Sequence, residues 1–96
     1  MDGMFGNATE FNKTINDWNV KSVTVMRDMF YRAYAFNQNL SGWKLNKNID
    51  ITNMFNYCDG LSKENYCEMY DAWKDNVNDI AHIGPYENER AKYTCN

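Results

Sequence analysis

The sequence predicts an α/β fold in which short parallel strands and short helices stack into a solenoid. Three observations predict this fold: a repeat of 25 residues, an apolar spacing typical of one helix face, and an apolar pattern typical of a strand. The chain has 96 residues, of which 44% are hydrophobic and 16% are aromatic. That composition is typical of a folded chain, and the length suffices for one domain with a modest core.

The repeat appears when the chain is aligned with itself at an offset of 25 residues. The identical pairs include Met4, Phe5, Ala8, Phe11, Asn12 and Trp18 with Met29, Phe30, Ala33, Phe36, Asn37 and Trp43. A third copy starts at Met54 and its similarity ends at Leu61. A fixed period of about 20 to 50 residues marks a solenoid, because stacked copies cover apolar faces that a single unit leaves exposed.

The first half of each unit has the spacing of a short helix. In the second unit, apolar residues follow one another at spacings of three, three, one and three: Val23, Met26, Met29, Phe30 and Ala33. These residues would share one helix face, so we expect a short helix that packs this face on the core.

The second half of each unit has the pattern L-x-x-L-x-L of a leucine-rich-repeat strand. It is formed by Ile15, Trp18 and Val20, and again by Leu40, Trp43 and Leu45. We therefore expect a short strand in each unit, paired in parallel with the next. This position also predicts that Trp18 and Trp43 are core residues and not sugar-stacking platforms.

An asparagine follows the second phenylalanine of each full unit, between the expected helix and strand. Asn12 and Asn37 occupy this place. An asparagine amide can bond backbone groups of a turn or tolerate a left-handed conformation. We therefore predict a structural role for both residues in preference to a ligand role.

The third unit leads into a different segment, which we expect to close the repeat array. Ser62 is a good N-cap, and an apolar stripe follows it: Tyr66, Met69, Tyr70, Trp73 and Val77. We predict a capping helix over residues 63–77, then a break at Gly84 and a tail over residues 86–96. The domain organisation is thus residues 1–61 for the solenoid repeats, two full units and a partial third, and residues 62–96 for the capping helix and tail.

The other end of the array carries no cap. Met1 takes the repeat position of Met26, and two full units are fewer than the three or so that a stable array usually needs. We expect the chain to be the C-terminal piece of a longer protein. Alternatively, this open repeat end docks on a partner or associates with a copy of itself.

The stretches "AFNQNLSGW" and "VKSVTVMRDMF" closely resemble the BspA-like surface-protein repeats, relatives of leucine-rich repeats in bacterial surface proteins and lipoproteins. The resemblance covers about residues 1–61. It implies a right-handed leucine-rich-repeat-like solenoid displayed at the cell surface or secreted, used for adhesion or protein binding. It transfers no catalytic residue. The chain departs from the family pattern at "LNKNIDITNMF", and the third unit lacks the Phe-Asn pair and the Trp.

The three cysteines allow more than one arrangement. Cys58 takes the Ala position of the repeat, which suits a small buried residue. Cys67 could bridge to Cys95 and pin the tail, or to Cys58 and pin the capping helix, and extracellular display would permit either disulfide. The spacing lacks a C-x-x-C pair, so we predict no zinc site with His82. A Cys-His nucleophilic pair needs an orienting third group, and nothing in the sequence points to one, so we predict no catalytic centre and no cofactor.

The function expected from these features is binding. A net charge of -3 gives no footprint for nucleic acid, and no apolar run is long enough for membrane insertion by this segment. The partner would be a host protein or a neighbouring surface protein, and the candidate binding face is the polar side of the expected strands: Asn16, Asp17, Asn19, Lys21, Ser41, Lys44 and Asn46. The alternative is a structural subunit of a larger shell or surface assembly, which stacks through its open repeat end.

Overall fold

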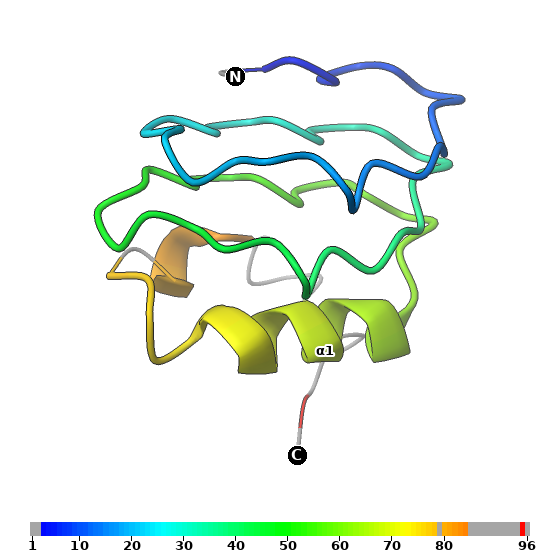
Figure 1. Ribbon diagram of the computed structural model, residues 1–96. Coiled ribbons are helices and arrows are strands. Elements are labelled where there is room, and N and C mark those ends of the chain that lie inside the picture. The colour runs from blue at the N-terminus through cyan, green and yellow to red at the C-terminus, as the bar shows by residue number, and fades with distance from the viewer. Residues whose placement is uncertain (1–2, 79, 85–94, 96) are drawn as a thin grey trace.

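In the computed structural model, residues 3–78, 80–84 and 95 are described. They form a compact body with a radius of gyration of 11.9 Å and extents of 28 × 28 × 19 Å. Figure 1 shows that the chain passes back and forth in levels above a helix at the bottom, with the N-terminus at the top. We call these levels layer 1 (residues 3–24), layer 2 (residues 25–49) and layer 3 (residues 50–62). We use "upper" and "lower" as in Figure 1.

The predicted fold class is wrong. The described residues contain one α-helix, α1 (Lys63–Trp73), one short 3-10 helix, η1 (Ile80–His82), and one isolated parallel bridge between Val25 and Asp50. They form no sheet, so the right-handed leucine-rich-repeat-like solenoid of short strands and short helices is not present. The layers consist of turns instead.

Two successive turns replace the short helix expected in layer 2. The backbone N–H of Met29 donates to the carbonyl of Met26, and that of Ala33 donates to the carbonyl of Phe30. The third residue of each turn has a positive φ, 56° at Asp28 and 60° at Arg32. A residue in this left-handed conformation interrupts an α-helix, and in a turn it is the signature of the type II geometry.

Layers 1 and 3 repeat this backbone geometry 25 residues away. The positive-φ residues form two series along the stack: Gly3, Asp28 and Asn53, and then Asn7, Arg32 and Tyr57. The apolar spacing read as a helix face is therefore the spacing of paired turns. Met26, Met29, Phe30 and Ala33 are buried as expected, and Val23 is partly buried.

A turn also replaces each expected strand. The backbone N–H of Trp18 donates to the carbonyl of Ile15 at 3.1 Å, and the N–H of Trp43 donates to that of Leu40 at 2.9 Å. Trp43 is buried, as predicted. The prediction that Trp18 is a core residue is wrong, because its side chain lies at the uncovered end of the stack and is 37% exposed.

The layers are joined by backbone hydrogen bonds at every second residue. The N–H groups of Gly3, Phe5 and Asn7 donate to the carbonyls of Arg27, Met29 and Tyr31. The same bonds then join layer 2 to layer 3, from Met26, Asp28, Phe30 and Arg32 to Asp50, Thr52, Met54 and Asn56. Turns leave alternate N–H groups free for this pairing, which a helix would have used internally.

The core between the layers is built around phenylalanine rings that lie above one another. The ring of Phe30 stacks on that of Phe5 at 5.6 Å and on that of Phe55 at 5.7 Å between centroids, with the planes nearly parallel. Phe11 and Phe36 form a second pair at 6.0 Å. The 25-residue period thus places like side chains in contact.

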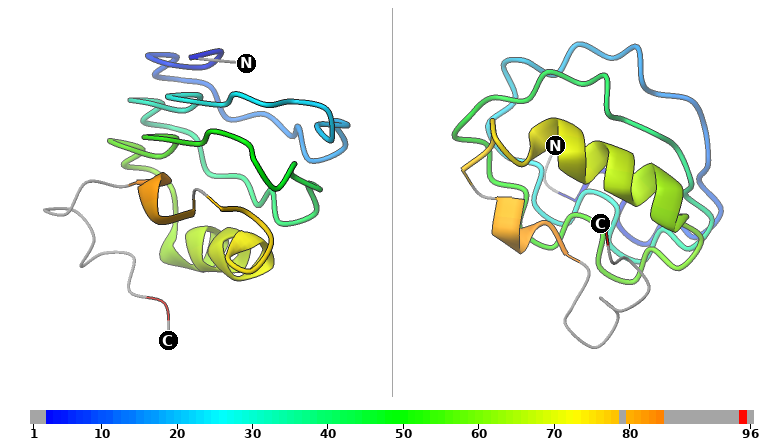
Figure 2. Two further views of the ribbon diagram at one scale, coloured as in Figure 1. Left: turned by 90° about the vertical axis from the view of Figure 1, so that its left-hand side faces the viewer. Right: turned by 90° about the horizontal axis from the view of Figure 1, so that it is seen from below.

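The lower end of the stack is closed by two segments. Ser62 caps α1 by accepting a hydrogen bond from the N–H of Asn65, as its sequence position predicts. The helix ends at Trp73, not at residue 77, and buries Tyr66, Met69 and Trp73 below layer 3. The view from below in Figure 2 shows α1 lying across the stack beside η1.

The structure selects one of the two cysteine arrangements. Cys67 on α1 forms a disulfide with Cys95. Cys58 is a buried thiol outside this disulfide, and its Sγ lies 3.5 Å from the carbonyl oxygens of Phe30 and Ala33. The rest of the predicted tail lies outside the described residues. No described helix has the length and apolar character needed to cross a membrane.

Candidate functional site

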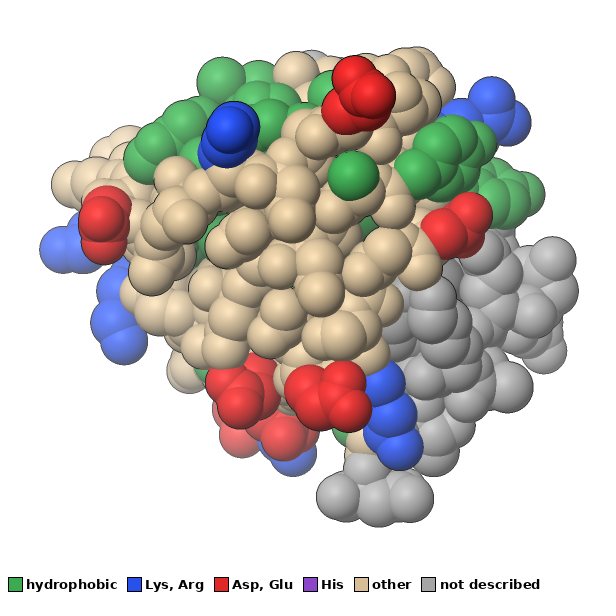
Figure 3. All heavy atoms as spheres, turned by 90° about the vertical axis from the view of Figure 1, so that its right-hand side faces the viewer, with side chains coloured by type: hydrophobic (Ala, Val, Ile, Leu, Met, Phe, Trp, Pro, Cys, Tyr) green, Lys and Arg blue, Asp and Glu red, His purple; other side chains and the backbone are tan. Residues whose placement is uncertain are grey.

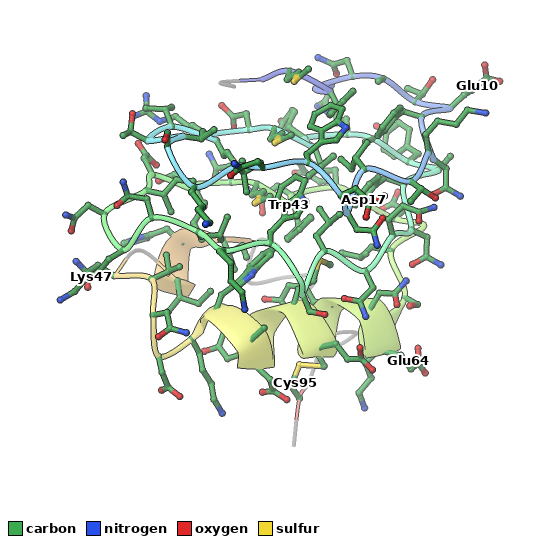
Figure 4. The ribbon with its side chains drawn as sticks, in the orientation of Figure 1. Glu10, Asp17, Trp43, Lys47, Glu64 and Cys95 are labelled. Atoms are coloured by element: carbon green, nitrogen blue, oxygen red, sulfur yellow. A yellow bond between two sulfur atoms is a disulfide. The ribbon has the colours of Figure 1, made fainter. Side chains whose placement is uncertain are left out.

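The residues of the predicted binding face lie at the surface of layers 1 and 2. Asn16, Asp17, Asn19 and Lys21 are exposed on layer 1. In layer 2, Lys44 is exposed, while Ser41 and Asn46 are partly buried. Figure 4 shows Trp43 enclosed between the layers, with Lys47 and Glu10 at opposite outer edges.

Two residues of the predicted face stabilise local turns. The Oδ1 of Asn19 accepts a hydrogen bond from the backbone N–H of Lys21 at 3.2 Å. The Oδ1 of Asn46 accepts one from the N–H of Asn48 at 2.9 Å. Each amide thereby closes a turn two residues ahead, which is a common use of asparagine. Asp17, Lys21 and Lys44 supply the charged groups of this face.

The asparagines that follow the second phenylalanine connect one layer to the next. The Oδ1 of Asn12 accepts hydrogen bonds from the backbone N–H of Asn37 at 2.9 Å and from the Nε2 of Gln38 at 2.8 Å. The Oδ1 of Asn37 accepts in turn from the N–H of Ser62 and the Nδ2 of Asn65, each at 2.9 Å. The predicted structural role is confirmed, although the bonded groups belong to the layer below and not to the residue's own turn.

The side of the molecule toward the right of Figure 1 is rich in uncharged polar groups. Figure 3 shows this face, with a broad area of polar and backbone atoms and acidic side chains gathered along its lower border. Glu10 and Glu64, labelled in Figure 4, lie toward this side. The face is therefore a polar surface with a negative border.

A shallow, open depression of about 400 Å³ lies along the turns of all three layers. It is lined by Gly3, Gly6, Asn7, Asp28, Tyr31 and Asn53. The described residues hold no group of three or more His, Cys, Asp or Glu side chains arranged to bind a metal ion. Sequence reasoning missed this depression, because its signal is the positive φ shared by Gly3, Asp28 and Asn53.

One ion pair joins layers 2 and 3 at the surface. The guanidinium of Arg27 donates to the Oδ2 of Asp50, with the Nε at 3.0 Å. This bond, helped by hydrogen bonds from the side chain and backbone of Thr52, lowers the pKa of Asp50 from its ordinary 3.8 to about 2. The pair joins two layers at their edge and lies outside the predicted binding face.

The upper face of layer 1 exposes several apolar side chains. Met4 is 51% exposed and Trp18 is 37% exposed, beside the partly buried rings of Phe5 and Phe11. Phe5 stacks on Phe11 at 4.0 Å and lies 5.9 Å from the ring of Trp18. These side chains form one aromatic surface at the end of the stack that α1 does not cover.

Comparison with protein families shows which family the chain belongs to. Residues 1–82 match the family described as "Mycoplasma protein of unknown function, DUF285". The chain belongs to the DUF285 family. The match spans all three layers, α1 and η1, so the whole stack and its lower closure carry the family's sequence pattern. No curated protein and no solved structure matches this DUF285 chain.

Proposed function

We propose that this DUF285 chain is a non-enzymatic surface or secreted protein that mediates adhesion or protein–protein binding. The observation that carries the proposal is the disulfide between Cys67 and Cys95. Disulfides form and persist in oxidising environments such as the cell exterior, and they are rare where thiols are kept reduced. The bond therefore favours a location outside the cytosol.

The repeat sequence supports the same location. The stretches over residues 20–30 and 35–43 resemble BspA-like surface-protein repeats in their Met-Phe, Phe-Asn-Gln and Trp positions. The proposal uses this resemblance for location and role alone, since the strand and helix architecture that it implied is absent from the described residues.

The binding surface that we propose is the exposed face of layers 1 and 2 around Asp17, Lys21 and Lys44. The turn closed by Asn19 holds the backbone N–H of Lys21 in place. A surface that is already ordered loses less conformational entropy when a partner binds, so more of the contact energy appears as affinity. The mixture of one carboxylate and two amines suits a polar protein surface with both signs of charge.

The alternative function, a structural subunit that stacks through its open end, draws support from the apolar upper face of layer 1. It requires that the lower end of one copy receive the upper end of another. The carbonyls of His82 and Ile83 already accept from the N–H groups of Asn53 and Phe55 on the lower side of layer 3. Because this lower side is occupied, we prefer the binding function.

Location is tested on intact cells that produce the protein. A protease added outside should remove it, and a membrane-impermeant maleimide should label Cys67 and Cys95 only after reduction. Protein that resists the protease until the cells are lysed, with both thiols already reactive, would contradict surface display.

Binding is tested with the purified protein and the same cells, intact or already shaved with protease. We expect saturable binding to intact cells, lost after shaving and weakened at least tenfold by the charge reversals Asp17→Lys and Lys44→Glu together, which correspond to about 1.4 kcal/mol. Asp75→Lys, an exposed residue beyond α1, is the matched control and should bind normally. Equal binding by all three proteins would exclude this face.

A further inference from the structure

The backbone groups that join the layers follow one fixed pattern. On the turn side, N–H groups of the upper layer donate to carbonyls below, as Phe5 does to Met29. On the opposite side the direction reverses, since the N–H of Ala35 donates upward to the carbonyl of Thr9 at 3.1 Å. The N–H of Asn37 also donates upward, to Asn12. The upper edge of layer 2 thus meets layer 1 through three carbonyls, those of Arg27, Met29 and Tyr31, and through the N–H groups of Ala35 and Asn37.

Layer 1 presents the same groups on its upper edge, where no other described segment lies against them. The carbonyls of Met4 and Gly6 take the places of the accepting carbonyls of Met29 and Tyr31. The N–H groups of Glu10 and Asn12 take the places of the donors Ala35 and Asn37. Within the part of the chain that the structure describes, none of these four backbone groups makes a hydrogen bond.

The side chains of layer 1 show the same incomplete contact. Met29, Phe30 and Phe36 of layer 2 are 0% exposed beneath layer 1. Their counterparts one repeat earlier differ: Met4 is 51% exposed, and Phe5 and Phe11 are only partly buried. The upper edge of layer 1 therefore carries both apolar surface and hydrogen-bonding groups. The equivalent groups of layer 2 have the same arrangement and are covered by layer 1.

We propose that the upper edge of layer 1 is a docking site for one further repeat of the same 25-residue pattern. This occupant would donate to the carbonyls of Met4 and Gly6, accept from the N–H groups of Glu10 and Asn12, and place a phenylalanine ring over Phe5. A strand-like edge recognised through its main chain in this way is a known mode of peptide binding.

An intact second copy does not fit this site in the head-to-tail direction. Its lower donors, Asn53 and Phe55, are bonded to His82 at 2.8 Å and Ile83 at 3.0 Å. The Oδ1 of Asn37 is likewise occupied by Ser62. The occupant is therefore a repeat whose lower edge is free, and the stack grows in one direction only.

The test adds such a repeat to the whole protein. A copy of residues 26–50, with Trp43→Phe in the copy alone, is placed ahead of Met1, so that its last residue precedes Met1 as Asp50 precedes Ile51. We expect a higher melting temperature and reduced acrylamide quenching of Trp18. Hydrogen exchange at the N–H groups of Glu10 and Asn12 should slow by roughly tenfold or more, because these groups become bonded.

The control carries Phe30→Ser and Phe36→Ser in the added copy alone, and should leave exchange at Glu10 and Asn12 unchanged. A folded extended protein with unaltered exchange at both residues would overturn the proposal. If the extended protein fails to fold, the same 25-residue segment is titrated as a peptide against the original chain. Shifts of the Glu10 and Asn12 amide resonances support the proposal, and their absence at millimolar peptide overturns it.

The oligomeric state of the unmodified protein gives an independent outcome. We expect a monomer by light scattering at all concentrations. A concentration-dependent dimer in which the amides of Glu10 and Asn12 become protected would show that a second intact copy occupies the edge, and would overturn the assignment of the occupant.

Discussion

The indole Nε1 of Trp43 donates a hydrogen bond to the backbone carbonyl of Ile15, 28 residues earlier in the chain, at 3.1 Å. The carbonyl of Trp43 itself accepts from the Nε1 of Trp73 on α1 at 3.3 Å. One residue thus links layer 1, layer 2 and the helix below them. Because the ring is only 2% exposed, both polar ends of this link are shielded from water.

Trp43→Ala should cost about 3–5 kcal/mol of unfolding free energy, since it leaves a large cavity and removes one of the two hydrogen bonds that the Ile15 carbonyl accepts. Trp18→Ala is the matched control. Its side chain is 37% exposed, and its loss should cost about 1 kcal/mol or less. Urea denaturation of both variants measures the difference. Equal losses would contradict the placement of the two rings.

Asn37→Ala should destabilise the protein by about 1–3 kcal/mol, because the N–H of Ser62 and the amide of Asn65 lose their shared acceptor. Asn37→Asp keeps an oxygen at that place and adds a negative charge near the N-terminus of α1, where the helix dipole favours it. It should therefore retain most of the stability. Thermal unfolding of the two variants distinguishes an acceptor role from simple packing. If Asn37 acted only by packing, both variants would lose the same stability.

Gly60→Ala should destabilise the protein by roughly 1–3 kcal/mol, because a methyl group there would overlap the backbone carbonyl of Tyr34 in layer 2. Gly42 has open space at the same position and no positive φ. Gly42→Ala should accordingly be neutral or slightly stabilising, since alanine has less conformational freedom to lose. A stable Gly60→Ala variant would show that layers 2 and 3 are further apart than described.

The ion pair of Arg27 and Asp50 predicts a specific acid sensitivity. The pKa of Asp50 is lowered to about 2 in the folded protein, so its contribution to stability is present above its ordinary value of 3.8. That contribution should fade as the pH falls from about 4 toward about 2. The stability difference between the unmodified protein and Asp50→Asn should shrink over this range, measured by denaturation at several pH values. Asp75→Asn serves as the control on an exposed carboxylate.

The sequence predicted which residues make the core better than it predicted their backbone. Met29, Phe30 and Trp43 recur at a fixed period and are buried where that period predicts. The spacing of three, three and one fits a helix and a pair of turns equally well, so it could not distinguish them. The backbone conformation is decided by hydrogen bonds to the next layer, whose residues lie about 24 positions away along the chain.

The residues with a left-handed backbone conformation were also not predicted from the sequence. Asp28, Arg32 and Tyr57 hold a positive φ, although glycine and asparagine are the residues that usually occupy it. In "MRDMFYRAY" Asp28 gives only a weak local signal of that geometry, and Arg32 gives none. In the first repeat the equivalent places hold Gly3 and Asn7, which carry the expected signal. The sequence therefore did not predict the depression that these turns line, because most of its left-handed positions are not glycine.

The replacement of strands and helices by turns affects how this protein will look to spectroscopy. Among the described residues, α1 alone, with 11 residues, has the long regular backbone that gives a strong far-ultraviolet signal. A circular dichroism spectrum would resemble that of an unstructured chain, even with the core packed. Folding is better followed through the fluorescence of Trp43 and Trp73, which are both enclosed and change their surroundings only when the stack opens.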